Sequence, residues 1–255
     1  MDVSFAGKVV LVTGASSGLG AALVHAFATS GAQGVAVHFH RHADGAERVV
    51  ERARAEGADA RGFQADLSRL GAPENLVADA LASFGAIDVL VNNAGAMVQR
   101  SAVEDAPDAL FDAVLDLNYR AVFATCRAVV PIMTRRGGGA IVNVSSSAAR
   151  NGGTGGSVLY AAAKAAVSTF SRGLAAEVAR HGIRVNVVAP GLFDTAFHDG
   201  VTSRAQLDRI GTTIPLGRAG RPEECAGPVL FLAHDVAASY VTGHSLEVNG
   251  GRLMP

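Results

Sequence analysis

Tryptophan is absent from this chain of 255 residues, and aromatic residues make up only 5% of it. Cysteine is nearly as scarce, because the chain has only Cys126 and Cys225 and neither belongs to a CxxC pair. This spacing excludes the usual patterns of a disulfide framework or a zinc site, and we expect no metal. With so few large rings, the core must be built mainly from Ala, Val, Leu and Gly.

An excess of one charge is also lacking, since 22 basic residues balance 23 acidic ones and the net charge is -1. The chain therefore offers no basic face for nucleic acid and no run of Lys or Arg suited to an anionic membrane. No stretch approaches the roughly 18 apolar residues that cross a bilayer, and the first residues lack the long apolar region of a signal peptide. We expect a soluble cytoplasmic protein that acts on small molecules.

Short β-branched runs alternate with longer amphipathic segments, from KVVLVT near the N-terminus to a strand expected around residues 245–248. This alternation predicts βαβ units, and the nearly continuous apolar runs predict strands covered on both faces. We therefore expect an α/β protein with a doubly wound parallel sheet, the three-layer Rossmann fold. The length fits a single domain over residues 1–255. Helices are predicted at about residues 18–30, 44–56, 73–84, 107–135, 158–181 and 222–233.

Between residues 192 and 213 the periodicity weakens, and we interpret this segment as a candidate substrate lid of short helices or a flap. Its basic side chains either bind an anionic substrate or simply solvate helices, which is the commoner role of surface charge. The apolar residues of the segment are Leu192, Phe193, Phe197 and Leu207, and the basic ones are His198, Arg204 and Arg209.

A glycine-rich turn, TGASSGLG at residues 13–20, directly follows the first predicted strand and opens the first predicted helix. Gly14 would permit the tight turn, Gly18 the close approach of a pyrophosphate to backbone N–H groups, and Gly20 close contact of helix and strand. The spacing is GxxxGxG rather than GxGxxG, so ordinary turn chemistry stays open as an alternative.

The segment after the second predicted strand reads HFHRH at residues 38–42, with no acid before Asp44. Dinucleotide sites of this architecture often place an acid here to bind the ribose 2′-OH. A 2′-phosphate would instead be attracted by Arg41 or a protonated His40, which favours NADP(H) over NAD(H). The alternative is a solvated basic loop. Asp66, after the third predicted strand, could bind the adenine amino group or serve as a turn residue.

Tyr160 and Lys164 stand four residues apart on one predicted helix, in the stretch YAAAK, after a run of three serines at residues 145–147. Residues at this spacing share a helical face, so the phenol and the ammonium can point into one site. A cation beside a phenol favours the phenolate and lowers its pKa from about 10 toward the working pH, as a general acid/base needs. The alternative is a packed ring and a solvated charge.

Taken together, these motifs resemble the short-chain dehydrogenase/reductases, in the branch that includes 3-oxoacyl-[acyl-carrier-protein] reductases and glucose dehydrogenase-like enzymes. The resemblance extends from Lys8 to Gly251. Its marks are TGASSGLG at 13–20, NNAG at 92–95, Asn118, the serine run, YAAAK at 160–164, Pro190-Gly191 with Thr195, and VNGG at 248–251.

The resemblance implies a catalytic tetrad. Tyr160 would protonate the carbonyl oxygen as hydride arrives, or deprotonate the alcohol in the reverse direction. Lys164 would lower the pKa of Tyr160 and hold the ribose hydroxyls of the nicotinamide. Ser146 would bind the substrate oxygen, and Asn118 would fix a water that links Lys164 to solvent. In this division the cofactor supplies hydride, and the protein supplies orientation and charge stabilisation.

The resemblance also implies which residues contact the cofactor. Asn93 has a separate interpretation, in which its side chain joins neighbouring strands. The expected cofactor contacts are Gly14, Ser16, Ser17, Gly18, Leu19, Gly20, His40, Arg41, Asp66, Leu67, Asn92, Ala94, Gly95, Tyr160, Lys164, Pro190, Gly191, Phe193 and Thr195.

Two positions depart from the family pattern. The family usually sets its serine 13 positions before the tyrosine, which is Ser147 here, whereas the second serine of the NxSS block is Ser146. Neighbouring side chains of a strand face opposite sides of the sheet, so only one of the two can address the site. We choose Ser146, because the glycine-rich loop at residues 151–156 can absorb an extra residue. Asn249, where the family commonly carries Asp, is expected to affect a subunit contact or the C-terminal turn.

The leading interpretation is an NADP(H)-dependent carbonyl reductase or secondary-alcohol dehydrogenase, with a 3-oxoacyl thioester as the best substrate hypothesis. Alternatives are an NAD(P)-dependent enzyme for a sugar, polyol or natural-product alcohol and, remotely, a non-catalytic nucleotide sensor or scaffold. The resemblance also suggests a homotetramer, with the helices at 107–135 and 158–181 pairing across a two-fold axis. An acyl carrier protein could dock on Arg135, Arg136 and Arg180, although arginines at helix ends also suit the helix dipole.

Overall fold

In the computed structural model, which describes residues 3–195, 197 and 202–254, seven strands form one parallel sheet. The strand order, β3-β2-β1-β4-β5-β6-β7, reverses direction between β1 and β4, which confirms the predicted doubly wound Rossmann fold. His198, one of the predicted lid residues, lies outside the described residues. The strands are β1 (Val9–Val12), β2 (Gly34–Phe39), β3 (Asp59–Gln64), β4 (Val89–Asn92), β5 (Gly139–Val144), β6 (Ile183–Pro190) and β7 (Ser245–Val248).

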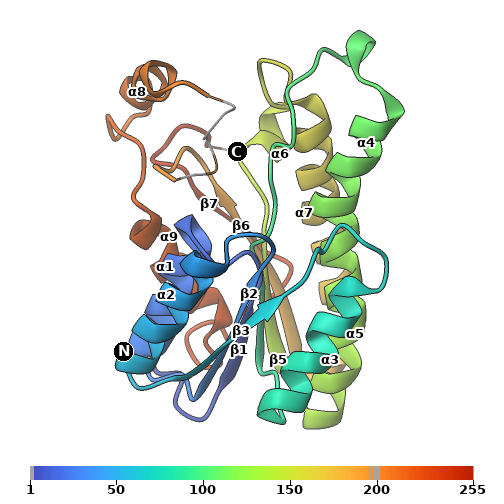
Figure 1. The fold of residues 1–255 in the computed structure, drawn as a ribbon, viewed down its shortest axis with the longest axis vertical. Helices are drawn as coiled ribbons and strands as arrows, with labels where there is room; N and C mark the ends of the chain where they lie inside the picture. Colours follow the sequence, from blue (N-terminus) through green and yellow to red (C-terminus); the bar gives the residue numbers. More distant parts are fainter. Residues whose placement is uncertain (1–2, 196, 198–201, 255) are drawn as a thin grey trace.

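Helices cover both faces of this sheet, so that the fold has three layers (Figure 1). Every residue of β1, VVLV, is buried, as expected for a strand between two helical layers. Each interface is filled mainly by Val, Ala and Leu, in keeping with the scarcity of aromatic residues. One face carries α1 (Gly18–Thr29), α2 (Ala43–Ala55) and α9 (Pro222–Ala233), and the other carries α3 (Ala72–Phe84), α5 (Ala121–Arg136) and α7 (Val158–Val178).

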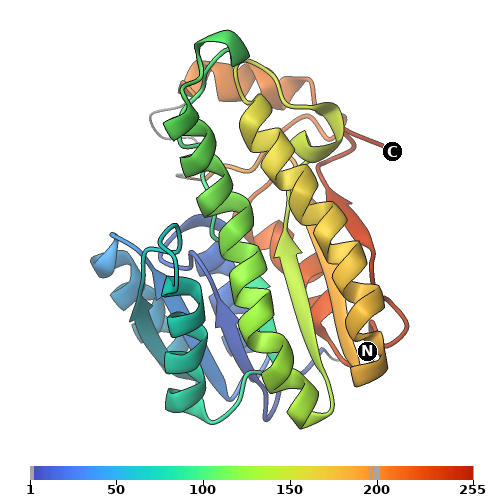
Figure 2. The same ribbon diagram turned by 90° about the vertical axis from the view of Figure 1, so that its right-hand side faces the viewer.

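Most predicted helix boundaries agree with the structure to within about two residues, and the helical region predicted over 107–135 is confirmed in extent but is not one regular α-helix. It consists of α4 (Asp108–Leu115) and α5, joined by a π-helical turn, η2 (Asp116–Arg120). Figure 2 shows the two as one long column beside α7. The helix predicted to reach residue 181 ends at Val178 and continues as a 3-10 turn, η3 (Ala179–His181). No helix in the described ranges is both long and apolar enough to span a membrane.

The loops that leave the carboxyl ends of the strands gather at one edge of the sheet, the upper end in Figures 1 and 2. Two short helices lie here: α6 (Ala148–Asn151), which was not predicted, and α8 (Arg204–Thr212), within the candidate lid. In open α/β sheets, ligands bind at this edge, near the point where the strand order reverses. The fold therefore places the predicted motifs where a nucleotide site is expected.

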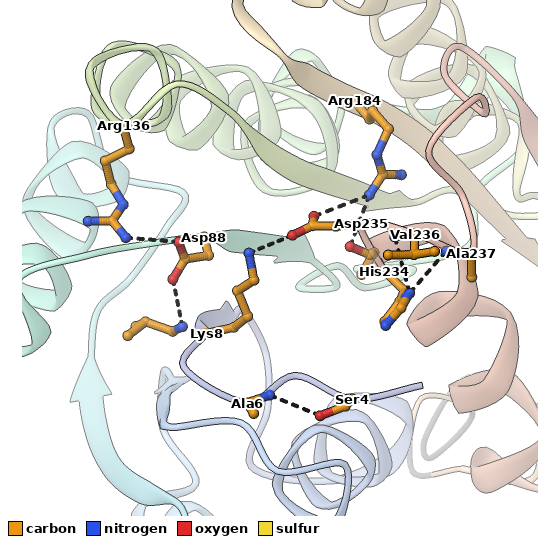
Figure 3. Close-up of polar contacts among 12 residues, drawn as sticks. Ser4, Ala6, Lys8, Asp88, Arg136, Arg184, His234, Asp235, Val236 and Ala237 are labelled. Carbon is orange, nitrogen blue, oxygen red and sulfur yellow. Dashed lines mark hydrogen bonds and ion pairs between the residues drawn. The ribbon is translucent and has the colours of Figure 1, made fainter. Parts of the chain in front are cut away.

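The three arginines considered for carrier docking lie at the opposite edge of the sheet, because α5 and α7 run antiparallel to the strands. Arg136 forms an ion pair with Asp88 at 3.1 Å. Lys8 and Arg184 both contact Asp235 in the same region, so this edge carries a network of ion pairs (Figure 3). A carrier bound there would not face the candidate site of the same chain.

Candidate functional site

A cavity of about 370 Å³ opens at the carboxyl edge of the sheet, between the N-terminus of α1 and the loops after β4, β5 and β6. It brings together the glycine turn, the serine run and one face of α7, which are far apart in the sequence. The predicted site residues that line it are Gly14, Ser17, Gly18, Leu19, Gly20, Gly95, Ser146, Tyr160, Lys164, Pro190, Gly191, Phe193 and Thr195.

Two glycines of the turn, Gly14 and Gly20, leave no room for a side chain. Gly14 has a φ of 62°, and a Cβ atom there would lie 2.8 Å from Cα of Ala94. A Cβ atom at Gly20 would lie 2.3 Å from the carbonyl oxygen of Gly14. α1 begins at Gly18, so the N–H groups of its first turn and its dipole favour an anion at this end. These features fit a dinucleotide whose pyrophosphate rests on the helix terminus.

Side chains of the neighbouring loops hold the glycine turn in place. Nδ2 of Asn93 donates to the carbonyl oxygens of Thr13 and Gly14, both at 2.9 Å. Oγ1 of Thr13 accepts from the N–H groups of Asn93 and Ala94, both at 3.0 Å. Asn93 therefore joins the ends of β1 and β4, as its separate interpretation predicted.

Two expected cofactor contacts have side chains that point elsewhere. Asn92 is only 1% exposed, and its Nδ2 donates to Oδ1 of Asn143 at 2.9 Å while its Oδ1 accepts from Thr125 at 2.8 Å. Leu67 is buried in the apolar core on the α3 and α5 side of the sheet. A cofactor contact by either residue would therefore have to come from its backbone, and it stays a prediction. Asn92 is the last residue of β4. Side chains alternate between the two faces of a strand, and that of Asn92 points toward the layer of helices that contains α5.

Asp66 is engaged within the protein at the expected adenine end. Its Oδ1 accepts from Oγ of Ser68 at 2.6 Å, and its Oδ2 lies 3.7 Å from Nε2 of His40. The hydrogen bond from Ser68 is the largest of the effects that lower the pKa of Asp66. The structure therefore favours the turn-residue alternative for Asp66.

The basic segment lies beside the glycine turn because α2 packs closely on it. A Cβ atom at Gly45, in the first turn of α2, would lie 2.6 Å from the carbonyl oxygen of Ser16, so only glycine permits this approach. Arg41 is exposed just before α2 begins. Ser16 lines a neighbouring hollow with Gly18 and Thr195 rather than the main cavity.

Tyr160 and Lys164 both lie on α7, and their side chains are 7% and 2% exposed. Nζ of Lys164 lies 5.8 Å from the centroid of the Tyr160 ring and donates to the carbonyl oxygen of Val144 at 2.9 Å. The hydroxyl of Ser146 accepts from the N–H of Ala148 at 3.1 Å and lies near enough to Tyr160 to lower the pKa of the phenol by hydrogen bonding. The structure thus excludes the alternative in which Lys164 is a solvated charge.

Burial governs the protonation of both groups. It raises the pKa of Tyr160 to about 12, against the opposing effect of the hydrogen bond with Ser146. It also lowers the pKa of Lys164 to about 8. The expectation that Lys164 brings the pKa of Tyr160 down toward neutrality was wrong for this structure, because surroundings of low dielectric penalise the phenolate more than its neighbours stabilise it. Tyr160 is held as a phenol, the form that can donate a proton to a carbonyl oxygen.

The serine run lies beyond β5, which ends at Val144. The hydroxyl of Ser145 donates to the backbone of α7 at 2.8 Å, and Ser147 is the N-cap of α6. Both Ser146 and Ser147 line the cavity, so the assumption that strand alternation admits only one of them was wrong. The hydrogen bond to Tyr160 distinguishes the two and favours Ser146.

Asn118 lies in the π-helical turn and is fully buried. Its Nδ2 donates to the carbonyl oxygens of Ala96 and Val114, both at 2.9 Å, and its Oδ1 accepts from the N–H of Ala96 at 3.1 Å. A Cβ atom at Gly95 would lie 2.8 Å from Oδ1 of Asn118 and 2.9 Å from Nζ of Lys164. The side chain of Asn118 therefore fixes the loop after β4 against Lys164. Such π turns occur often at functional sites.

The far wall of the cavity includes residues that the sequence did not single out. Arg100 donates from Nη1 to the carbonyl oxygens of Thr154 and Gly155 at 3.0 and 2.9 Å, and from Nη2 to Oγ1 of Thr202 at 3.3 Å. It thereby ties the glycine-rich loop before α7 to the candidate lid. No periodicity or motif marks Arg100, because its partners lie more than 50 residues farther along the chain. Other lining residues missed in this way are Met97, Ile210 and Arg252.

Two further expectations are resolved by hydrogen bonds outside the cavity wall. Arg204 is ion-paired with Asp194 at 2.8 Å, which favours the structural alternative for this lid charge. Asn249 donates from Nδ2 to the carbonyl oxygen of Leu253 at 2.9 Å and accepts from the N–H of Gly251 at 3.0 Å. Asn249 therefore stabilises the C-terminal turn.

Comparison with known proteins places this site in a family. The family described as enoyl-(acyl carrier protein) reductase matches residues 14–252. A 3-oxoacyl-[acyl-carrier-protein] reductase of Synechocystis sp. is 38% identical, with 97% of each chain covered. Dehydrogenase/reductase SDR family member 4 of Oryctolagus cuniculus is also 38% identical, with 96% of this chain and 94% of that protein covered. The chain belongs to the short-chain dehydrogenase/reductase family.

Solved structures of the family agree with the fold over nearly the whole chain. The NADH-dependent reductase A1-R′ superposes with a TM-score of 0.90 at 34% identity, covering 98% of this chain and 99% of that one. A 3-oxoacyl (acyl-carrier-protein) reductase from Agrobacterium tumefaciens C58, with NADP bound, gives 0.90 at 31% identity and covers 98% and 96%. The chain is therefore an oxidoreductase that acts on CH–OH and C=O groups with a nicotinamide cofactor.

The geometry shows what the side chains of such an enzyme can contribute. A bound nicotinamide dinucleotide supplies or accepts the hydride. Tyr160 holds a proton on its phenolic oxygen, and the hydroxyl of Ser146 beside it can share the same substrate oxygen. Lys164 donates to the carbonyl oxygen of Val144 and places an ammonium group, whose pKa is lowered by burial, near the Tyr160 ring. Tyr160 and Lys164 are both buried, and burial strengthens the electrostatic interactions between such groups.

The two serines give a direct test of the register. We predict that Ser146→Ala lowers kcat by at least about 100-fold, as loss of a transition-state hydrogen bond does, and that Ser147→Ala lowers it by less than about fivefold. Because the hydrogen bond with Ser146 lowers the pKa of Tyr160, the apparent pKa for alcohol oxidation should rise in Ser146→Ala. Steady-state rates across pH check both points. The opposite ranking of the two variants would assign the role to Ser147.

Proposed function

We propose that the protein is an NADP(H)-dependent reductase of ketones whose best single substrate is a 3-oxoacyl thioester. The observation that carries ketone reduction is geometric: Tyr160 and Ser146 line one cavity, and Nζ of Lys164 lies 5.8 Å from the centroid of the Tyr160 ring. An acyl chain suits the apolar wall formed by Met97, Leu207 and Ile210. Relatives named 3-oxoacyl-[acyl-carrier-protein] reductases support the choice of thioester.

In this proposal Tyr160 donates the proton, Ser146 binds the substrate oxygen and Lys164 holds the ribose hydroxyls of the nicotinamide. Asn118 acts as a positioning residue, because its side-chain hydrogen bonds go to Ala96 and Val114 rather than into the cavity. A water that connects Lys164 to solvent would have to share Oδ1 of Asn118 with the N–H of Ala96.

The substrate proposal is tested by a panel measured with NADPH under identical conditions. The panel contains 3-oxoacyl thioesters of several chain lengths, ketoses, keto sugar acids and cyclic ketones. We expect kcat/KM to be at least about tenfold higher for the thioesters, a difference of about 1.4 kcal/mol in transition-state binding. A preference for a sugar-derived ketone would replace the thioester by the sugar or polyol alternative. Binding of NADPH without turnover of any compound would revive the nucleotide-sensor alternative.

The preference for NADP(H) rests on Arg41, because His40 already faces Asp66 at 3.7 Å. We predict that Arg41→Ala weakens NADPH binding by about tenfold and leaves NADH binding unchanged, since a guanidinium pairs with the 2′-phosphate and not with the 2′-OH. The measurement is a fluorescence titration of the bound reduced nicotinamide. Arg135→Ala, an exposed arginine at the opposite edge of the sheet, is the matched control. Equal or tighter binding of NADH by the unaltered protein would overturn the preference.

We propose that residues 192–213 form a substrate lid that is anchored at its start and again at Thr202. Phe193 pairs with Gly220 as an isolated bridge, and the N–H of Gly220 donates to the carbonyl oxygen of Leu192 at 2.9 Å. Farther along the lid, Thr202 accepts from Arg100. The ring of Phe197 lies 5.8 Å from that of Tyr160, so the lid reaches the catalytic tyrosine.

A homotetramer is the proposed assembly, with α4, α5 and α7 pairing across one two-fold axis. Support comes from large apolar side chains that these helices expose: Phe111, Phe123 and Val158 are 47%, 37% and 46% exposed. Light scattering at micromolar concentration should give four times the chain mass of 26.0 kDa. A monomer would contradict this proposal. It would also contradict carrier docking at the far edge of the sheet, because a carrier bound there could deliver its substrate only to the site of a neighbouring copy.

A further inference from the structure

His38 is the one residue of β2 whose backbone and ring both bind the glycine turn. Its carbonyl oxygen accepts from the N–H of Ala15 at 2.7 Å, as a continuation of the sheet ladder. Its ring atom Nδ1 accepts from the N–H of Gly14 at 2.9 Å. The residue is only 2% exposed, so its ring is buried against the glycine turn.

The second ring nitrogen binds the loop on the other side. Nε2 lies 3.1 Å from the carbonyl oxygen of Ala65, the residue that joins β3 to Asp66. A backbone N–H can only donate and a carbonyl oxygen can only accept, which fixes the tautomer of His38 with its proton on Nε2. Burial, the largest cause, lowers the pKa of His38 to about 4, in keeping with a neutral ring at pH 7.

Gly14 is consequently held from two directions. Its N–H donates to His38 on β2, and its carbonyl oxygen accepts from Nδ2 of Asn93 after β4 at 2.9 Å. A glycine with a φ of 62° has wide conformational freedom in the absence of such bonds. Fixing it before a ligand binds removes an ordering cost that the ligand would otherwise meet.

We propose that His38 is a positioning residue of the cofactor site, which sets the spacing between the phosphate-binding turn after β1 and the loop after β3 by bridging Gly14 and Ala65. No other uncharged side chain presents an acceptor and a donor on opposite sides of a rigid ring. The inference depends on the nicotinamide dinucleotide site and not on the proposed substrate, so it is tested with the cofactor alone.

The test compares His38→Leu, which removes both ring hydrogen bonds, with His38→Asn, which retains an acceptor for the N–H of Gly14. We expect the Kd for NADPH, from fluorescence titration, to rise at least about tenfold in His38→Leu and by a smaller factor in His38→Asn. With any ketone that the enzyme reduces, kcat at saturating NADPH should stay within about threefold of the unaltered protein. A fall in kcat with an unchanged Kd would overturn the proposal.

His234 provides a matched control at the opposite edge of the sheet (Figure 3). It is also buried, at 9% exposure, and its Nδ1 accepts from the N–H groups of Val236 and Ala237 at 3.3 and 3.0 Å. His234→Leu should lower the melting temperature and leave the Kd for NADPH unchanged. An equal rise in Kd in His234→Leu and His38→Leu would show a general loss of stability and overturn the positioning role.

Nitrogen-15 NMR of the histidine rings in the unaltered protein keeps the proposal testable if His38→Leu does not fold. The expected spectrum at pH 7 shows a neutral His38 with its proton on Nε2. A proton on Nδ1 of His38 would rule out the hydrogen bond from Gly14 and with it the proposal.

Discussion

A buried ammonium group constrains the centre of this structure. Nζ of Lys164 has one backbone partner, the carbonyl oxygen of Val144, and no carboxylate is among the described residues that line the cavity. The drop in the pKa of Lys164 from 10.5 to about 8 corresponds to a cost of about 3 kcal/mol for keeping it charged. The surrounding chain packs closely around this ammonium group. β5 ends where its last carbonyl reaches Lys164, residue 95 is glycine because a Cβ would lie 2.9 Å from Nζ, and the π-helical turn places Asn118 alongside.

On the nucleotide side of the cavity, hydrogen bonds between uncharged groups hold the structure in place. Thr13, Asn93 and His38 tie the glycine turn to β2 and β4 through side chains, so its shape is set by the sheet rather than by the turn itself. The two halves meet where Ala94 packs on Gly14 and its neighbour Gly95 packs on Lys164. One short loop after β4 thereby fixes the distance between the phosphate end and the proton-transfer end of the site.

Much of the fold could be predicted from the sequence, because its signals are local. Alternating apolar runs located the seven strands, and α9 and β7 have the predicted bounds. The π-helical turn could not be predicted, since Leu115 and Tyr119 continue an ordinary helical pattern and the extra residue is accommodated by hydrogen bonds from Asn118 to Ala96 and Val114. The structure favours the predicted Ser146, but the presence of both Ser146 and Ser147 on the cavity wall escaped prediction, because β5 ends at Val144 and the alternation of a strand does not extend through the serine run.

The sequence by itself determined the family and the order of its motifs, because each motif is a local pattern of residue types. It also marked Tyr160 and Lys164 as site candidates through their spacing, and Asn118 through the family resemblance. Only the tertiary structure decided which groups the cavity contains and how they are protonated. Asn92 lies in the core and Arg100 on the cavity wall, and neither placement follows from neighbours in the chain. The pKa of Tyr160 rises rather than falls because burial depends on everything packed around the ring, whereas the sequence shows only the lysine four residues away.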